Sequence, residues 1–327
     1  GHVSNDIIEF YTKMSESGAG LITIGASAVS KEGGSTANGM RVGPREFEPG
    51  LRRLALSVKK TGALCSLQIF HVGAQGNTIY SGQPVVGPSP YTCPDIGIEA
   101  RELKITEIER IEDEFAAAIL SGLKVGFDFV EIHAGHGDLL HQFLAPYFNH
   151  RVDPYGGTVE NRLRIFRNIV SKISIHNKEA FRRVGIRISG NDFVEGGMSI
   201  ETNRPLVELM EKQGVAYWTV SAGIYETAQK KYEYMKNGDY YRYAAALSEF
   251  AKGVVVAQGG IRDPMTIANI LKEKQSDMVG VAQALIADPT FLRKAFSGRS
   301  HTIVPCVECG RCRYIKRKDL TFDCVRT

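Results

Sequence analysis

Seven short apolar runs alternate with amphipathic segments along the chain, and this alternation constrains the fold more than any other feature. We expect the runs to be strands, at residues 21–24, 63–70, 129–133, 184–188, 216–220, 254–257 and 278–281. Short apolar strands separated by helices are typical of a parallel sheet that is covered on both faces. The pattern predicts an α/β protein of the TIM (β/α)8 barrel type, in which eight strands are each followed by a helix.

The helix signals fit this alternation. Ser4 is expected to cap a first helix, and Thr106 with Glu109 three residues later predicts another helix start. Further helices are expected at residues 51–60, 160–174, 205–213, 244–251 and 265–272. Residues 72–105 are rich in Gly and Pro and predict a long loop with a short hairpin at most. Because the residues given begin on a helix, we expect the first barrel strand to precede Gly1.

Composition narrows the class of protein. The 327 residues carry a net charge of +4 and are 43% hydrophobic, which allows a large core and gives no argument for a nucleic-acid partner. We find no apolar run of the roughly 18 residues that a membrane span needs, and no secretory signal. Cysteines crowd the last residues instead of spreading along the chain, which favours a reduced cytoplasm and a bound metal over a disulfide framework.

The apolar run at 129–133 leads into two histidines, His133 and His136, which stand beside Gly135 and Gly137. The carboxyl ends of barrel strands are where active sites form. Two imidazoles there can stabilise one anionic oxygen. They could also share one metal ion, but no acidic or cysteine ligand follows in a recognised pattern.

The whole segment 129–162, with its run Arg-x-Asp-Pro-Tyr-Gly-Gly-x-x-Glu-Asn-Arg from Arg151 to Arg162, resembles the old yellow enzyme family of FMN-dependent oxidoreductases. The resemblance covers essentially the whole chain. It implies a barrel that binds FMN, takes electrons from NAD(P)H and acts on an unsaturated carbonyl, a thioester or another small organic substrate. It also implies that His133 and His136 hold the substrate oxygen.

The same resemblance assigns residues to the flavin ring. Gln68 and His71 match the family's Gln-x-x-His-x-Gly, in which the amide binds the ring, and Ala26 matches a backbone contact. Arg187 matches an arginine beside flavin N1 and O2, where a guanidinium would stabilise the charge added on reduction. Other readings stay open: an ordinary interior amide at Gln68, a core histidine at His71 and a buried ion pair at Arg187.

A phosphate site is expected where the last two strands end. Gly259 and Gly260 follow one strand, and Ala282 and Gln283 follow the other. The family usually has Gly-Arg where this chain has Ala282-Gln283. This change removes a charge-assisted clamp on the phosphate, and Arg262 is a candidate to replace it.

A second departure concerns the proton donor. Two residues after the second histidine the family has a tyrosine that protonates the alkene, and this chain has Asp138. A carboxyl can donate a proton only where burial raises its pKa. Tyr225 is the alternative donor. Asp138 could instead fix a histidine tautomer or lie in solvent.

Four cysteines, Cys306, Cys309, Cys312 and Cys324, crowd the end of the chain. Four thiolates can hold a [4Fe-4S] cluster or a structural zinc. The cluster would match a subgroup of the family that this chain resembles, which includes 2,4-dienoyl-CoA reductases and trimethylamine dehydrogenase. In that subgroup three residues usually separate the second and third cysteines, whereas two residues separate Cys309 from Cys312. We therefore expect an FMN barrel at 1–300 and a cluster-binding tail at 301–327.

Other functions stay open. The chain could be an electron-transfer subunit of a larger flavoprotein complex, or a zinc-capped barrel lyase without flavin. A basic cluster at 311–318 is either a solvated face or a docking patch for an acidic electron-transfer partner. The tyrosines between 225 and 243 predict a lid over the flavin site. The sequence leaves a homo-oligomer possible, and no Gly-x-Gly-x-x-Gly nucleotide motif occurs in these residues.

Overall fold

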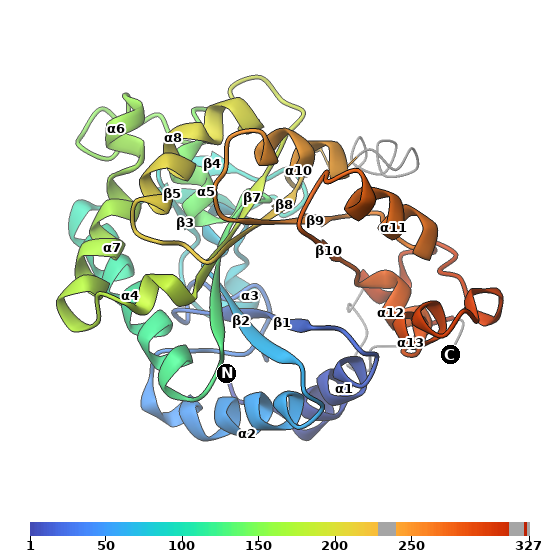
Figure 1. Cartoon of the computed structure of the whole chain (residues 1–327). Helices are drawn as coiled ribbons and strands as arrows, with labels where there is room; N and C mark the ends of the chain where they lie inside the picture. Colours follow the sequence, from blue (N-terminus) through green and yellow to red (C-terminus); the bar gives the residue numbers. More distant parts are fainter. Residues whose placement is uncertain (228–239, 314–323, 326–327) are drawn as a thin grey trace.

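A computed structural model describes residues 1–227, 240–313 and 324–325. All seven predicted strands are present, in one parallel sheet of order β1-β2-β6-β7-β8-β9-β10. The strands are β1 (Leu21–Ala28), β2 (Leu64–Phe70), β6 (Phe129–Ala134), β7 (Val184–Ser189), β8 (Tyr217–Ser221), β9 (Val254–Gln258) and β10 (Met278–Gly280). The sheet curls into a half-barrel, with β1 and β10 as its two edges in the described part of the chain (Figure 1). The α/β fold is confirmed, and the eighth strand stays a prediction.

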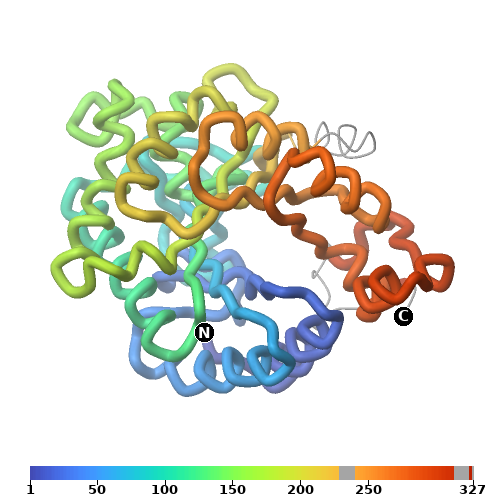
Figure 2. Tube along the Cα trace, viewed as in Figure 1, coloured from blue at the N-terminus to red at the C-terminus, as the bar shows by residue number. Residues whose placement is uncertain are grey.

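Helices surround the outer face of the curled sheet, as the tube in Figure 2 shows. The longer ones are α1 (Asn5–Ser15), α2 (Glu48–Lys59), α4 (Ile105–Lys124), α7 (Arg164–His176), α8 (Ile200–Glu211), α10 (Tyr241–Ser248) and α11 (Pro264–Lys272). The shorter ones are α3 (Thr78–Ser81), α5 (Leu139–Leu144), α6 (Val159–Arg162), α12 (Gln283–Ala287) and α13 (Phe291–Phe296). Short 3-10 turns lie at Arg45–Phe47, Gly73–Gln75, Ala180–Arg183, Ser300–Thr302 and Arg311–Arg313. None of the helices in the described ranges has the length and apolar character that crossing a membrane requires.

Two helix starts differ from the prediction. The capping box at Thr106 is wrong, because α4 begins at Ile105 and the Glu107 carboxylate accepts the Lys104 N–H at 2.8 Å. The helix predicted at 205–213 begins at Ile200, where the Ser199 hydroxyl caps it. The N-cap at Ser4 is confirmed, since its hydroxyl accepts the Ile7 N–H at 3.2 Å. The helix predicted at 160–174 is divided into α6 and α7 around Leu163.

The long excursion after β2 contains a small sheet of its own. Its strands are β3 (Val86–Gly87), β4 (Tyr91–Thr92) and β5 (Glu99–Glu102), in the order β3-β5-β4. Strands β4 and β5 are antiparallel, so the short hairpin is confirmed. The ring of Tyr91 packs edge-on against Phe148, which joins this small sheet to the segment after α5.

The parallel register lines up side chains in rows across the barrel interior. Gln68 lies opposite Glu131, and Glu131 lies opposite Gly185, which in turn lies opposite Tyr217. Gly185 leaves room for its neighbour, because a methyl group built there would overlap the ring of Tyr217. The Tyr217 hydroxyl then reaches the Ser66 hydroxyl at 2.7 Å. The next row toward the carboxyl ends consists of His133, Arg187 and Thr219, with Arg187 between the other two.

Substituting Gly185 by alanine should lower the free energy of unfolding by about 1–3 kcal/mol, because the added methyl overpacks the barrel interior. Gly20→Ala is a matched control, since a methyl group there meets no atom within 4 Å. Urea unfolding of both variants measures the difference. Equal stability of the two variants would show that the Tyr217 ring does not depend on the space at Gly185.

Candidate functional site

A cavity of about 250 Å³ opens at the carboxyl ends of β7 to β10. Six residues predicted for the site line it: His136, Arg187, Gly259, Gly260, Ala282 and Gln283. The lining also includes Ser221 and Gln258, which the sequence did not single out, and Tyr240, one of the tyrosines of the predicted lid. The structure thus brings the expected ring-binding arginine and the expected phosphate-binding backbone into one cavity.

Arg187 lies at the base of this cavity, partly buried on β7. Its Nε donates to the Ser221 hydroxyl at 3.1 Å, and its Nη2 lies 3.0 Å from Nε2 of His136. A guanidinium can only donate, so Nε2 of His136 accepts and the imidazole proton lies on Nδ1. Burial lowers the pKa of Arg187, and the nearby Glu131 and Asp138 act in the opposite direction.

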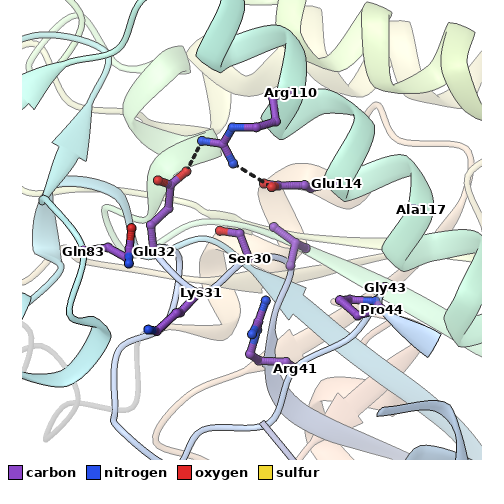
Figure 3. Close-up of a pocket in the computed structure, with 11 residues that line it drawn as sticks. Ser30, Lys31, Glu32, Arg41, Gly43, Pro44, Gln83, Arg110, Glu114 and Ala117 are labelled. Carbon is purple, nitrogen blue, oxygen red and sulfur yellow. Dashed lines mark hydrogen bonds and ion pairs between the residues drawn. The ribbon is translucent and has the colours of Figure 1, made fainter. Parts of the chain in front are cut away.

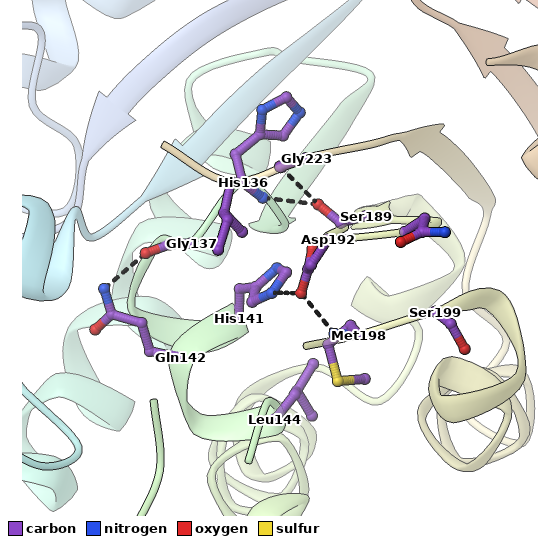
Figure 4. A network of polar contacts seen from close by, with 12 residues as sticks. His136, Gly137, His141, Gln142, Leu144, Ser189, Asp192, Met198, Ser199 and Gly223 are labelled. Carbon is purple, nitrogen blue, oxygen red and sulfur yellow. Dashed lines mark hydrogen bonds and ion pairs between the residues drawn. The ribbon is translucent and has the colours of Figure 1, made fainter. Parts of the chain in front are cut away.

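The turn that carries His136 has an uncommon backbone. His136 has φ +59° and Gly137 has φ +83°, and a non-glycine residue in the left-handed region is costly unless its surroundings hold it. The Ser189 hydroxyl accepts the His136 N–H at 2.9 Å (Figure 4). The amides of Gln75 and Gln142 bind the carbonyls of His136 and Gly137 at 3.0 and 2.6 Å. These contacts hold the backbone of the turn from which the His136 ring extends.

His133 comes from the end of β6 and its ring lies edge-on to that of His136, with 5.4 Å between centroids. Nε2 of His133 is 3.7 Å from Oδ2 of Asp138. The three residues predicted for catalysis in this segment are therefore neighbours, although His133 and Asp138 do not line the cavity described above.

Asp138 is buried, with 6% of its surface exposed, and the reading of a solvated loop residue is wrong. Burial raises its pKa well above the ordinary value, which the positive charge of Arg187 only partly offsets. Its side chain does not cap α5, although Asp138 is the N-cap residue. Tyr225 is 39% exposed, and desolvation together with the charge of Asp138 raises its pKa further above the usual value.

Beneath the cavity lies a buried polar group that the sequence analysis missed. The Glu131 carboxylate accepts hydrogen bonds from Nε2 of Gln68 and from the Thr219 hydroxyl, each at 2.6 Å. Gln68 therefore lies inside the barrel next to the site and does not line the cavity. The signal was available, because a charge inside the apolar run 129–133 needs a partner as much as Arg187 does.

His71 and Ala26 lie elsewhere. His71 is buried, with its Nε2 3.7 Å from Glu32, which also pairs with Arg110. Although burial opposes ionisation, the contacts with His71 and Arg110 lower the pKa of Glu32 to about 2. Glu32 and Arg110 line a second cavity of about 430 Å³ between the segment after β1 and α4 (Figure 3). Neither Ala26 nor His71 lines the first cavity, and their predicted roles stay predictions.

A buried histidine–aspartate pair connects two segments that carry residues of the site. Nε2 of His141, on α5, lies 2.7 Å from Oδ2 of Asp192, in the segment after β7, and both side chains are fully buried (Figure 4). Asp192 also accepts the Met198 N–H. The pair ties the segment of His136 and Asp138 to the segment after Ser189. Its partners are 51 positions apart in the chain, so spacing gave no signal for it.

The cysteine tail is described only in part. Cys312 lines the first cavity, and Arg262 pairs with Glu308 of the tail instead of lining that cavity. Among the residues that the structure describes, no three His, Cys, Asp or Glu side chains gather as a metal site. Residues 314–323, with most of the basic cluster, lie outside the described residues. So do residues 228–239, with Tyr232 and Tyr234 of the predicted lid, whereas its Tyr225, Tyr240, Tyr241 and Tyr243 are described.

Comparison with known proteins decides the family. A model of the NADH:flavin oxidoreductase / NADH oxidase family matches residues 1–302. The chain belongs to this family. It is 35% identical to an NADH oxidase of Thermoanaerobacter brockii over 95% of its own length and 48% of the relative's, so it spans about half of that protein.

Two further comparisons concern a second relative and the fold. The chain is 30% identical to an NADPH dehydrogenase of Bacillus subtilis, over 84% of this chain and 79% of the relative. Its fold is that of a 2-naphthoyl-CoA reductase solved with 2-naphthoyl-CoA, with a TM-score of 0.88 and 24% identity over 95% of this chain and 50% of that one. The chain is thus part of a family of flavin-dependent oxidoreductase enzymes.

The residues present fit an FMN group. Gly259 and Gly260 have φ of +113° and +69°, a backbone conformation that favours glycine, and neither residue has a side chain of its own beside its N–H group. Gln283 supplies an amide to the same wall, and Arg187 supplies the positive charge. A cavity that holds both neutral donors and a guanidinium suits a phosphate and a ring that gains negative charge on reduction.

The raised pKa of Asp138 predicts a specific pH dependence of stability. Above about pH 4 the aspartate ionises in the unfolded chain while it keeps its proton in the folded one, which favours unfolding. Asp138→Asn should therefore gain stability over the wild type as pH rises above about 4, by at most about 1.4 kcal/mol per pH unit. The gain should level off above the folded pKa. Chemical unfolding from pH 4 to 8 measures it, and a flat or falling difference would contradict the burial argument.

Proposed function

We propose that the chain binds FMN in the cavity at the ends of β7 to β10 and reduces small unsaturated carbonyl or thioester substrates with electrons from NAD(P)H. One observation carries this proposal: Arg187 and His136 share a cavity with the Gly259–Gly260 backbone and Gln283. Family membership supports the redox chemistry, and the cavity supports the place where it occurs.

Each part of the cavity has a proposed task. Gly259, Gly260, Ala282 and Gln283 would hold the phosphate, and Arg187 with Gln68 would hold the ring. Ala26 and His71 would support the ring from β1 and from the end of β2. When bound, FMN supplies two-electron transfer. Arg187 would then stabilise the negative charge that the flavin gains on reduction.

His133 and His136 would bind the substrate oxygen. Their rings lie next to each other, and the turn that carries His136 is held by Ser189, Gln75 and Gln142. Imidazoles held this way can meet a developing oxyanion without rearranging, which is the arrangement that stabilises a transition state.

Asp138 is the better proton donor of the two candidates. A general acid works best when its pKa lies near the operating pH. Burial raises the pKa of Asp138 well above its ordinary acidic value, whereas burial raises the pKa of Tyr225 further above a value that is already high. Asp138 would thus take the place of the family's phenolic acid.

A cluster of the [4Fe-4S] type in the tail is part of the proposal, with residues 1–300 as the FMN barrel and 301–327 as the tail. The four-cysteine spacing supports it, and so does the position of Cys312 on the wall of the FMN cavity. A thiolate there would bring an electron carrier close to the flavin. The same contact favours a second candidate function, transfer of electrons through this chain to or from a partner. A reduced cytoplasm would suit such thiolates.

Anaerobic titration of the cofactor-free protein with FMN tests the binding site. The wild type should bind FMN, and Arg187→Met should weaken binding by about 10- to 100-fold because a charged donor is lost. Arg262→Met is the control, since Arg262 pairs with Glu308 and does not line the cavity. Iron and sulfide quantitation on the same sample tests the tail. Equal binding by all three proteins would place the flavin elsewhere, and zinc without iron would exclude the cluster.

Steady-state reduction of an enone by the FMN-loaded protein tests the proton donor. Asp138→Asn should lower kcat by about 100-fold, as expected for loss of a general acid. Tyr225→Phe should leave kcat close to the wild type. The reverse pattern would assign the proton to Tyr225, and no enone turnover by the wild type would favour the electron-transfer function.

A further inference from the structure

Glu131 is a charged residue that the proposed chemistry does not use. It lies in the middle of β6, with 2% of its surface exposed, between the buried Val130 and Ile132. A carboxylate taken out of water into an apolar strand is costly unless hydrogen bonds or an opposite charge compensate it. Its contacts therefore indicate what it is for.

The first contact of Glu131 fixes the orientation of the Gln68 amide. Oε1 of Glu131 accepts from Nε2 of Gln68 at 2.6 Å, and Oε2 accepts from the Thr219 hydroxyl at 2.6 Å. A carboxylate only accepts, so it selects the amide orientation in which the Gln68 nitrogen faces β6. The Gln68 oxygen then lies on the opposite side, 3.2 Å from the position of a methyl group built on Gly25. Glu131 thus decides which atoms of Gln68 are presented to a ligand.

The second contact is electrostatic. Glu131 and Asp138 are the two carboxyl groups that act on Arg187 and favour its charged form. Glu131 lies opposite Gly185, two positions before Arg187 on the neighbouring strand, and it acts on Arg187 more strongly than Asp138 does. Glu131 is therefore the main carboxylate that offsets the Arg187 guanidinium from beneath the cavity.

We propose that Glu131 is a positioning residue for the flavin: it sets the orientation of the Gln68 amide and offsets the charge of Arg187 at the ring. This inference rests on the proposed FMN site. It predicts that Glu131 tunes both the affinity for FMN and its reduction potential, without touching the substrate.

Glu131→Gln tests both parts, because it removes the charge and keeps the shape. With Arg187 no longer offset, the site favours the more negative, reduced form of FMN over the oxidised form by about tenfold. For a two-electron couple a tenfold change corresponds to a midpoint potential higher by about 30 mV. Oxidised FMN should also bind more weakly, because a neutral amide no longer selects one orientation of Gln68.

Two further variants separate these effects and remain informative if Glu131→Gln does not fold. Glu131→Asp keeps the charge but draws the carboxylate back from Gln68, so it should weaken FMN binding and leave the potential unchanged. Thr219→Val removes one hydrogen bond to Glu131 without changing the charge or the Gln68 contact. It should leave both the potential and the affinity at the wild-type values.

The outcomes separate this inference from the proposed function. A wild type that does not bind FMN overturns both. A wild type that binds FMN while Glu131→Gln and Glu131→Asp match it in potential and affinity overturns only the role of Glu131. Equal shifts in Thr219→Val and Glu131→Asp would also overturn it, because they would show a general loss of packing. The role of Glu131 is supported if the potential rises in Glu131→Gln alone and FMN binds more weakly to both Glu131 variants.

Discussion

The charge of Glu131, buried beneath the cavity, and that of Arg187, on the cavity wall, form the constraint on which the rest of the site depends. A charge taken out of water is costly unless hydrogen bonds or an opposite charge compensate it. The barrel meets this cost by surrounding Glu131 with the donors Gln68 and Thr219, and Arg187 with Ser221 and His136. The strand register that sets these contacts therefore also sets the geometry of the cavity.

The register itself depends on small features of the strands. Gly185 has no side chain, and the ring of Tyr217 occupies the space that a side chain would need. That ring closes the bottom of the polar row by reaching Ser66. A polar interior that satisfies its own hydrogen bonds is rigid, and a rigid support holds the groups above it in place.

Much of the fold could be predicted from the sequence, because each strand of the large sheet is a short apolar run. The grouping of His136, Arg187, Gly259 and Gln283 could also be predicted, since they lie in or just after such runs and share a cavity. Their roles in chemistry stay predictions. The start of α8 was misplaced for a local reason, because Ser199 was not recognised as a cap. Most of what could not be predicted depends on contacts between distant positions.

The pair of His141 and Asp192 illustrates the same limit, because nothing local marks either residue as a partner of the other. The raised pKa of Asp138 is another example, since a residue after a glycine reads as a solvated loop until the surrounding chain encloses it. Glu131 is different. Its burial could have been inferred from its place in an apolar strand, by the argument that identified Arg187.

A crystal structure of the protein grown with FMN under anaerobic conditions tests the account most directly. The account predicts electron density for the phosphate at Gly259, Gly260 and Gln283, and for the ring against Arg187 and Gln68, with the Gln68 nitrogen still bound to Glu131. Flavin density in the cavity beside Glu32 and Arg110, or a ring that contacts neither Arg187 nor Gln68, would contradict it.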